Sequence, residues 1–291
     1  MGGRQSYATF ETYTAVADGD RAAEIAATTS PFQIEVRFVQ GLTPGQKAVF
    51  AEAAERWTRV IVGDLETAIV RDFSGTVIVD DVLIDAEGVP IDGTDQVPNI
   101  LGQAGPTRFR RPNAVSGARL PVTGRMRFDS ADLAAMEADG SLLDVITHEM
   151  GHVLGVGTLW DDFGLREDFP GPNPVYVGPA AMKEFGTLVG EPPAPVPVAN
   201  VGGLGSAGSH WRESVFDNEL MSPNIDGNDN PLSRLTVASL QDLGYTVDLD
   251  AAEPYALPNL LAIARSGRVL AAEPRRLVLP TVPSRVPAEA P

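Results

Sequence analysis

The chain has 291 residues, is 43% hydrophobic and carries a formal net charge of −17 at pH 7. It is long enough for one sizeable catalytic domain, or for two small lobes around a shared cleft. The acidic balance argues against nucleic acid or an anionic membrane surface as a partner; it fits ordinary solubility, and the carboxylates also offer oxygen ligands for calcium.

The chain contains no cysteine. This excludes disulfides, thiolate metal ligands, a cysteine nucleophile and a cysteine-based latency switch. No apolar run approaches the roughly 18 residues that a membrane span requires. The first residues, MGGRQSYATFETY, lack the apolar stretch of a signal peptide, so we expect a processed or trimmed chain, or one exported by another route.

Residues 1–30 are polar and alanine-rich without a clear period, and we expect an N-terminal extension there. Apolar and polar residues then alternate from Phe32 to Phe38, which predicts a half-buried strand. A helix follows, with Thr43 as its cap, Pro44 at its first position and Gln46 completing a capping box.

Further strands are expected over 76–84, over 100–104 and around Met126 and Phe128, where an acidic turn at 129–132 ends the strand. The next helix begins near Ser141 and stops at Gly155. Residues 160–210 are rich in glycine and proline, which indicates loops. A helix over 232–243, capped by Ser233, restores regular structure.

These elements predict an α+β fold of two lobes. Residues 31–155 form a twisted sheet backed by two helices, and residues 156–250 form a largely irregular lobe closed by a terminal helix. Residues 251–291 contain five arginines and three glutamates, against 17 basic and 36 acidic residues before them, so we expect a tail outside the core.

The stretch from His148 to His152 reads HEMGH. On a helix, histidines four residues apart point the same way and can bind one metal ion, while Glu149 can reach a water molecule beside it. The opposite face carries apolar residues that can anchor the helix in a core: Ile146, Met150 and Val153. The alternative is that the HExxH pattern occurs by chance on an amphipathic helix and binds no metal.

A catalytic zinc ion needs a third protein ligand. The metzincin pattern HExxHxxGxxH is met as far as Gly155, but Thr158 stands where the third histidine is expected. Two other candidates remain. His210 is the only other histidine in the chain, and Glu219 is the best placed carboxylate for a gluzincin-type site.

Four segments carry a resemblance to a known family: HEMGHVLG, SHWRES, NELMSP and LTVASLQDLGY. Together they are similar to the leishmanolysin family of metzincins, over about residues 31–250. In that family an insertion of several dozen residues after the glycine displaces the third histidine, which implies His210 as the ligand. NELMSP resembles the family's Met-turn and implies that Met221 lies beneath the metal.

Two more segments resemble metzincins in general: ILGQAGP is similar to their cleft-edge strand, and GRMRFDSADL to the strand and loop before the active-site helix. The protozoan members are rich in disulfides, have a cysteine latency switch and often a lipid-anchor signal. This chain resembles a reduced, bacterial-type relative, so neither latency nor anchoring is carried over.

The resemblance implies a metzincin-like zincin with an active-site cleft: a zinc endopeptidase that cleaves extended or unfolded protein segments. His148, His152 and His210 would hold the zinc ion, and Glu149 would be the general base. The edge strand at 100–104 would bind a protein or peptide substrate by main-chain hydrogen bonds. An extracellular or cell-surface location is expected, and the oligomeric state is left open.

Two alternatives stay open. One is a gluzincin-type peptidase with Glu219 as third ligand; the other is a non-catalytic, zinc-containing adhesion or binding module, which the intact Glu149 disfavours. Structural calcium is a further possibility, because two regions are rich in oxygen ligands: the loop 224–230, which fails the EF-hand spacing, and the group Asp80, Asp81, Asp85, Asp92 and Asp95. Tyr245 is expected to pack rather than to stabilise an oxyanion.

Overall fold

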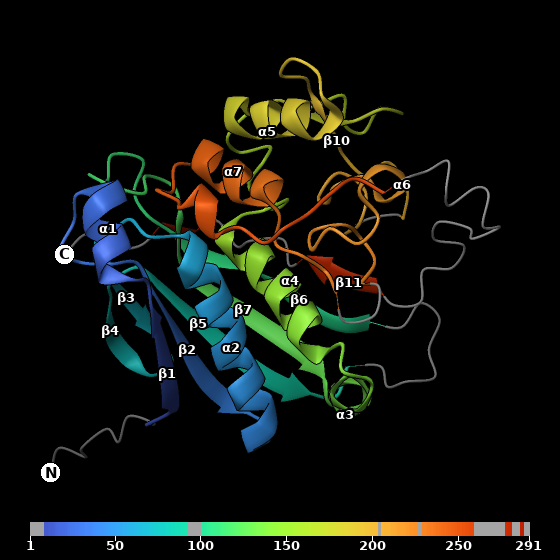
Figure 1. The fold of residues 1–291 in the computed structure, drawn as a ribbon. Helices are drawn as coiled ribbons and strands as arrows, with labels where there is room; N and C mark the ends of the chain where they lie inside the picture. The colour runs from blue at the N-terminus through green and yellow to red at the C-terminus, as the bar shows by residue number, and fades with distance from the viewer. Residues whose placement is uncertain are drawn as a thin grey trace, which may run out of the picture.

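The computed structural model of the protein describes residues 9–91, 100–202, 205–225, 229–258, 277–280 and 286–287. A mixed sheet organises this part of the chain (Figure 1), with strands in the order β1-β2-β5-β7-β6-β11 and with β12 beside β6. Its members are β1 (Glu11–Val16), β2 (Gln33–Gln40), β5 (Val82–Val89), β6 (Ile100–Phe109), β7 (Pro121–Asp129), β11 (Leu277–Pro280) and β12 (Val286–Pro287). Strands β2, β5 and β7 run parallel to one another, whereas β6 is antiparallel to β7.

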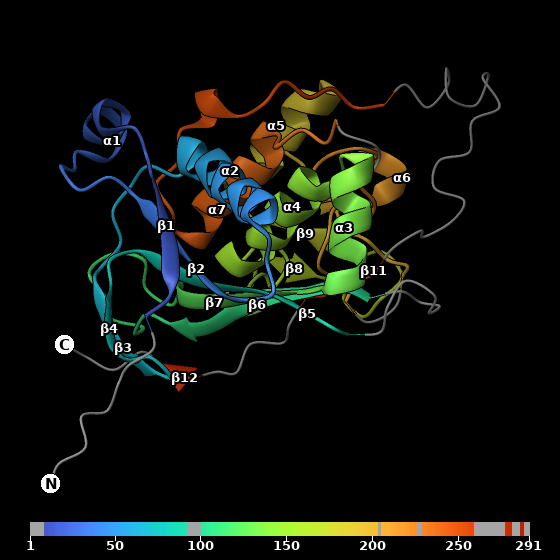
Figure 2. The ribbon, with the colours of Figure 1, turned by 90° about the horizontal axis from the view of Figure 1, so that it is seen from below.

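One face of the sheet is covered by three helices (Figure 2): α2 (Pro44–Val60), α3 (Ser130–Asp139) and α4 (Leu142–Leu154). Helix α2 begins as the sequence predicts, because the Thr43 hydroxyl accepts the N–H of Gln46 and the Gln46 side chain accepts the N–H of Thr43. The indole of Trp57 is fully buried, and its Nε1 donates to the backbone oxygen of Thr147 at 2.9 Å. This bond connects α2 to α4.

Helix α4 lies directly on β7, because Gly124 leaves room for it. A Cβ atom at Gly124 would lie 2.2 Å from Cγ1 of Val153. Ile146, Met150 and Val153 are fully buried, so the face that we predicted as the packing face is indeed in the core. The helix ends at Gly155, whose φ of 114° requires a residue without a side chain.

The prediction of one strand over 76–84 is wrong, because these residues belong to two strands. β4 (Gly75–Val79) pairs with β3 (Ala68–Asp72) in a separate hairpin, and β5 enters the main sheet. The chain changes direction at Asp81, whose carboxylate accepts the N–H groups of Gln33 at 2.8 Å and Leu65 at 2.7 Å. An aspartate with two backbone partners terminates a strand where the apolar pattern alone continues it.

The strand predicted over 100–104 is longer than expected, because β6 continues to Phe109 through Pro106. Proline has no N–H for the ladder, and the pairing with β7 shifts register just after it, between Pro106 and Arg108. The acidic turn predicted at 129–132 is instead the start of α3, where the Asp129 carboxylate caps the helix by accepting the N–H of Ala131 at 2.8 Å.

Residues 1–30 are not simply an extension. Residues 11–16 form β1, which pairs antiparallel with β2, and α1 (Gly19–Ala26) follows it. Only Ala15 of β1 is buried, so the apolar signal of this strand in the sequence is weak. Its place in the sheet comes from backbone pairing with β2, together with the packing of Ala15 and the partly buried Tyr13 on the core.

The second lobe contains more regular structure than predicted. A small sheet is formed by β8 (Arg166–Glu167), β9 (Val175–Tyr176) and β10 (Val196–Pro197), and α5 (Pro179–Val189) packs on α7 (Arg234–Leu243). α6 (Glu213–Phe216) and the 3-10 helix η1 (Leu249–Ala251) complete the lobe. Helix α7 is confirmed: Ser233 caps its first turn and Gly244 ends it with a φ of 110°.

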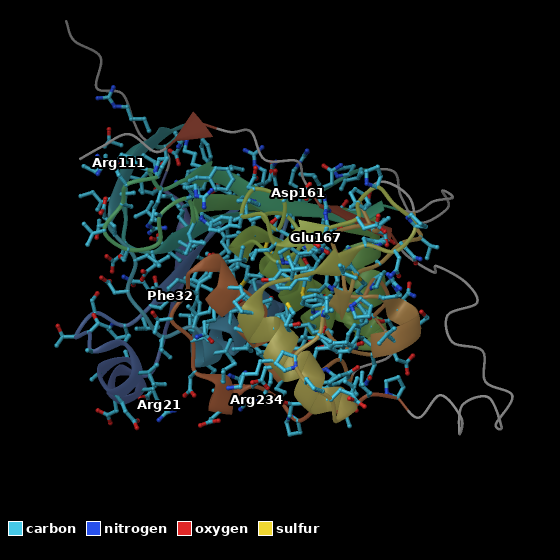
Figure 3. The ribbon with its side chains drawn as sticks, turned by 90° about the horizontal axis from the view of Figure 1, so that it is seen from above. Arg21, Phe32, Arg111, Asp161, Glu167 and Arg234 are labelled. Carbon is cyan, nitrogen blue, oxygen red and sulfur yellow. The ribbon has the colours of Figure 1, made fainter. Side chains whose placement is uncertain are left out.

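The chain beyond α7 packs against several elements. Figure 3 shows Arg21 of α1 and Arg234 of α7, which form ion pairs with Asp248 at 2.6 Å and with Asp250 at 3.0 Å. Glu253 pairs with a guanidinium of α2, so the beginning of the predicted tail belongs to the packed body. Within the described residues, no helix has the length and apolar character required to cross a membrane.

Candidate metal centre

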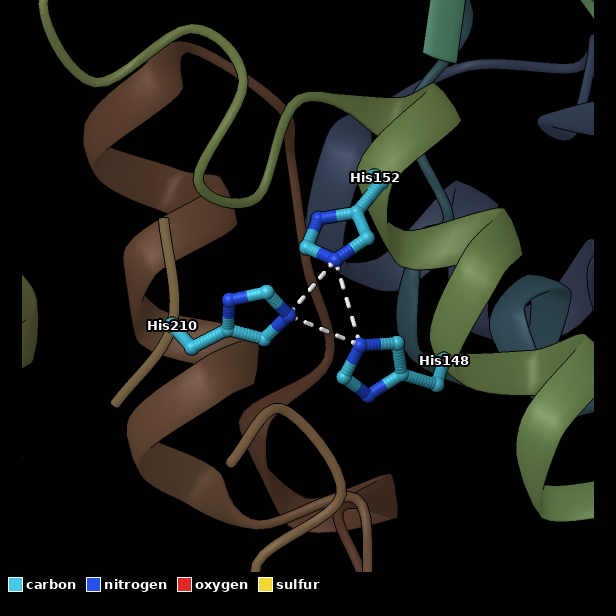
Figure 4. A group of neighbouring side chains, drawn as sticks. All are labelled: His148, His152 and His210. Atoms are coloured by element: carbon cyan, nitrogen blue, oxygen red, sulfur yellow. Dashed lines mark hydrogen bonds between the residues drawn. The ribbon is translucent and has the colours of Figure 1, made fainter. Parts of the chain in front are cut away.

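Two histidines of α4 and one from a distant part of the chain come together (Figure 4). The Nε2 atom of His148 lies 3.0 Å from that of His210 and 3.1 Å from that of His152, and the latter two are 3.0 Å apart. His148 and His152 come from successive turns of α4, as the spacing predicts, and His210 approaches from the second lobe. The three nitrogen atoms form a nearly equilateral triangle.

The other ring nitrogen of each histidine is held by a backbone oxygen. Nδ1 of His148 lies 2.7 Å from the oxygen of Leu220, that of His152 lies 2.8 Å from Val156, and that of His210 lies 3.0 Å from Ser206. A carbonyl oxygen only accepts, so each Nδ1 carries the proton and each Nε2 presents a lone pair. Sequence reasoning missed these three acceptors, because a backbone oxygen has no residue-type signal.

Three lone pairs that face one another at these distances cannot satisfy each other. All three histidines are buried, with exposures of 3% or less. Burial lowers the pKa of His148 to about 4 and that of His210 to about 3, and it holds the pKa of His152 well below its usual value. The rings are therefore neutral, and their three Nε2 lone pairs converge on a point where a cation could bind.

Glu149 adds a second unsatisfied group at the same place. Both carboxylate oxygens are buried and have no hydrogen-bond partner. The nearest of the histidine nitrogens, Nε2 of His148, is 3.8 Å from Oε1, which is beyond hydrogen-bond distance. Burial raises the pKa of this carboxyl well above its ordinary value. A buried carboxylate without donors is costly, so a polar partner beside Glu149 would relieve this cost.

The long segment between α4 and His210 leaves the helix and returns beside it. A Cβ atom at Gly157 would lie 1.9 Å from the backbone oxygen of Ser209, so the beginning and the end of this segment are in direct contact. Thr158, which stands at the usual third-histidine position, donates its hydroxyl to the backbone oxygen of His152 at 2.7 Å. It finishes the helix rather than facing the triangle.

Met221 lies under α4 where the resemblance implies a Met-turn. A Cβ atom at Gly151 would be 2.8 Å from Sδ of Met221, so the thioether fits against the helix only because position 151 is glycine. The backbone oxygen of Met221 accepts the N–H of Trp211 at 3.0 Å. The Met-turn therefore touches both α4 and the residue that follows His210.

Glu219 does not join the histidines. Oε2 accepts the N–H of Met221 at 2.7 Å, and Oε1 accepts the Thr236 hydroxyl at 2.5 Å and the Ser233 hydroxyl at 2.6 Å. The carboxylate is fully buried in this network, between the Met-turn and the start of α7. This arrangement favours His210 over Glu219 as the third member of the group.

The other candidate groups have structural partners. Asp64, Asp80 and Asp81 come together with ligand atoms within 4.8 Å, but Asp81 already accepts two backbone N–H groups. Asp85 forms an ion pair with Arg37 at 2.6 Å. Asp81 and Asp85 are therefore held by partners within the protein. Asp92, Asp95 and residues 226–228 of the other oxygen-rich loop lie outside the described residues.

Tyr245 takes the packing role that the sequence favours. It is 2% exposed, and its hydroxyl donates to the backbone oxygen of Leu154 at 2.9 Å, at the end of α4. The phenol hydroxyl is therefore used in a hydrogen bond at the C-terminal end of α4.

Comparison with known proteins agrees with this geometry. A model of the leishmanolysin family matches residues 102–262, a range that contains all three histidines, Glu149 and Met221. The chain belongs to the leishmanolysin family. It is 32% identical over 145 residues to the leishmanolysins of Leishmania donovani and Leishmania major.

The match to these two leishmanolysins covers 46% of this chain but only 24% and 23% of theirs. The leishmanolysin of Leishmania chagasi is similar to the same extent, at 32% over 146 residues. The matched part of the chain therefore spans about a quarter of the length of these relatives.

Proposed function

We propose that the chain is a zinc-dependent endopeptidase, with His148, His152 and His210 as the zinc ligands. The observation that carries the proposal is the triangle of three Nε2 lone pairs at 3.0–3.1 Å, each fixed by a backbone acceptor on the other side of its ring. Because zinc binds imidazole nitrogen at about 2.0–2.1 Å, one ion can contact all three nitrogen atoms of such a triangle. Family membership supports the same assignment.

The donor set fits a catalytic rather than a purely structural zinc site. Structural sites close with four protein ligands, commonly including cysteine, and this chain has no cysteine. Three histidines leave one coordination position for a small molecule, and the buried carboxylate of Glu149, with Oε1 3.8 Å from Nε2 of His148, has no hydrogen-bond partner. The chemistry that zinc supplies at such a site is activation of water and polarisation of a scissile carbonyl.

Glu149 is the general base in this proposal. Its carboxylate accepts a proton from the attacking water and delivers it to the nitrogen of the leaving amine. The pKa raised by burial suits this exchange, because a carboxylate of ordinary acidity holds a proton poorly at neutral pH. Placement beside the histidines, on the same helix, keeps it within reach of the reacting atoms.

The substrate class follows from β6. A strand that offers main-chain groups to an extended segment selects unfolded or flexible protein segments, because a folded chain has its own backbone groups paired. We therefore propose that β6 binds such a segment as an added strand. The preferred substrates are then protein or peptide segments in an extended conformation, and an exported protein is the natural setting for this activity.

The test is hydrolysis of casein or of a quenched fluorescent peptide by the purified chain. Activity should disappear with a chelator and return with one equivalent of zinc. Glu149→Gln should retain zinc and lose activity by several orders of magnitude, because it removes the proton acceptor and leaves the ligands intact. Glu167→Gln, at an exposed position in β8, is the matched control and should behave like the wild type.

Each alternative predicts a different result. A non-catalytic binding module would bind zinc at the three histidines, but neither the wild type nor the Glu167→Gln control would show chelator-sensitive hydrolysis. A gluzincin-type site would lose zinc on substitution of Glu219 and keep it on substitution of His210. Either outcome would replace the proposal.

A further inference from the structure

The outer side of β6 is already paired. β7 runs antiparallel along one side of the strand, and β11 and β12 run parallel to it along the other. In β11, Leu277 is the register partner of Ile100 and Pro280 that of Ala104; in β12, Val286 is the partner of Arg108. A strand has two hydrogen-bonding edges, so β6 has no free edge at 100–104 and 108–109 while β7, β11 and β12 are in place.

The paired stretch includes 100–104, the part of β6 that we expected to receive an extended substrate. β11 also lies close to α4, with Cα atoms within 8 Å of the helix that carries His148 and His152 (Figure 1). The histidines are 3% exposed or less, and Glu149 is fully buried. In this arrangement a polypeptide substrate cannot approach the site until another part of the chain moves.

We propose that β11 and β12 are an internal competitor for the substrate position on β6, so that substrate binding requires these two strands to leave β6. This inference rests on the proposed function, in which β6 binds the substrate. It identifies the partner of that edge as a segment of the same chain and predicts that peptidase activity is restrained by it.

The prolines of the two strands make their pairing reversible. Pro280 and Pro287 lie within the paired stretches and have no N–H, so they remove donors from the ladder with β6. The missing donors limit the strength of the pairing.

The first experiment changes the segment within the full chain. Leu277→Gly, Val278→Ser, Leu279→Gly and Pro280→Ser together lower the strand propensity of β11. A matched variant places the same Gly-Ser sequence at residues 270–273, which precede β11 in the sequence. If the segment covers β6 in about nine molecules of ten, the β11 variant lowers KM about tenfold and leaves kcat unchanged, since only the competent fraction changes. The control variant keeps the KM of the wild type.

A synthetic peptide of residues 277–287 gives the reverse test. Added to the β11 variant, it should inhibit competitively with substrate, and a peptide of the same composition in scrambled order should not. Equal KM values for the wild type and both variants, or equal inhibition by the two peptides, would overturn the proposal.

A disulfide between β6 and β11 tests the competition for β6 without measuring catalysis. The chain has no cysteine, so Gln103→Cys with Leu279→Cys, which are register partners in β6 and β11, introduces a single disulfide. Neighbouring strands about 4.8 Å apart are within the range that a disulfide spans. Binding of a labelled, extended peptide is measured by fluorescence anisotropy in the oxidised and reduced forms, with each single-cysteine variant as control.

The proposal requires binding by the reduced form alone. Equal binding by the two forms contradicts it, whether or not the protein is a peptidase. Absence of chelator-sensitive hydrolysis in every variant, together with peptide binding that depends on the redox state, would reject the proposed function and retain the competition for β6.

Discussion

Nδ1 of His148 donates to the backbone oxygen of Leu220 at 2.7 Å, which connects helix α4 to the Met-turn. This bond fixes the tautomer and the orientation of the ring, because the backbone oxygen cannot donate in return. Leu220 is flanked by Glu219, which is bound to α7, and by Met221, which packs on α4. The geometry of one ligand on α4 is therefore set by a turn that is distant in sequence.

Removal of metal should lower thermal stability. Three buried Nε2 lone pairs converge without a proton between them, so a bound zinc ion relieves a cost that the metal-free protein carries. Ligand that is present at about 1,000 times its Kd stabilises a native state by about 4 kcal/mol. We expect a chelator to lower Tm and stoichiometric zinc to restore it, measured by differential scanning calorimetry. His210→Ala should unfold at the same temperature with and without zinc; a zinc-dependent Tm in this variant would argue against His210 as a ligand.

Glu219→Gln should weaken zinc binding although Glu219 does not face the triangle. The substitution replaces an acceptor oxygen by an NH2 group that confronts the N–H of Met221 or the hydroxyls of Ser233 and Thr236. Loss of a hydrogen-bond partner that orients the metal ligands typically weakens metal affinity about 10–100-fold. A competition titration with a chromogenic chelator measures the change. An unaltered zinc Kd, in a variant with wild-type circular dichroism, would show that the Met-turn holds its position without this carboxylate.

Gly151→Ala should destabilise the protein even though alanine is the better helix former. The added Cβ atom would lie 2.8 Å from Sδ of Met221 and 2.9 Å from Cζ2 of Trp57. Overpacking of this kind costs about 1–3 kcal/mol, which exceeds the gain of about 1 kcal/mol in helix propensity. Gly19→Ala at the start of α1, where no atom lies within 4 Å of the new Cβ, is the control. Chemical denaturation should show a lower midpoint for Gly151→Ala alone, and a midpoint at or above that of the wild type would disprove the close fit.

Local patterns in the sequence were sufficient for the helices that carry the site. The HExxH spacing placed His148 and His152 on one face of α4, and Thr43 with Gln46 marked the start of α2, because both signals depend on residues within one or two turns. Strand β1 was missed since its side chains are mostly exposed, and α5 was missed between glycine- and proline-rich segments.

The third histidine could not be derived from spacing. Residues 156–209 separate it from Gly155, and nothing near His210 resembles a ligand pattern. Only the resemblance of SHWRES and NELMSP to a known family indicated it. The backbone oxygens of Leu220, Val156 and Ser206 were beyond prediction, because their role depends on the fold and not on their residue types.

Arg56 should be one of the strongest single determinants of stability. It is 8% exposed and lies on the side of α2 that faces both α4 and the second lobe. Nη1 pairs with Asp144 at 2.7 Å, Nη2 pairs with Glu253 at 2.6 Å, and Nη2 also donates to the backbone oxygen of Asn230 at 2.7 Å. One guanidinium therefore joins α4, the helix that carries His148 and His152, to the chain on either side of α7.

Arg56→Met should lower the free energy of unfolding by about 3–5 kcal/mol, because it leaves the buried Asp144 carboxylate without its cation. Arg59→Met, on the exposed side of the same helix, should change it by about 0.5 kcal/mol or less. The double variant Arg56→Met with Asp144→Leu should recover part of the loss, since it removes the uncompensated charge as well. Urea denaturation of the four proteins measures each step. If Arg56→Met and Arg59→Met unfold at the same urea concentration, the ion pairs of Arg56 do not hold the two lobes together.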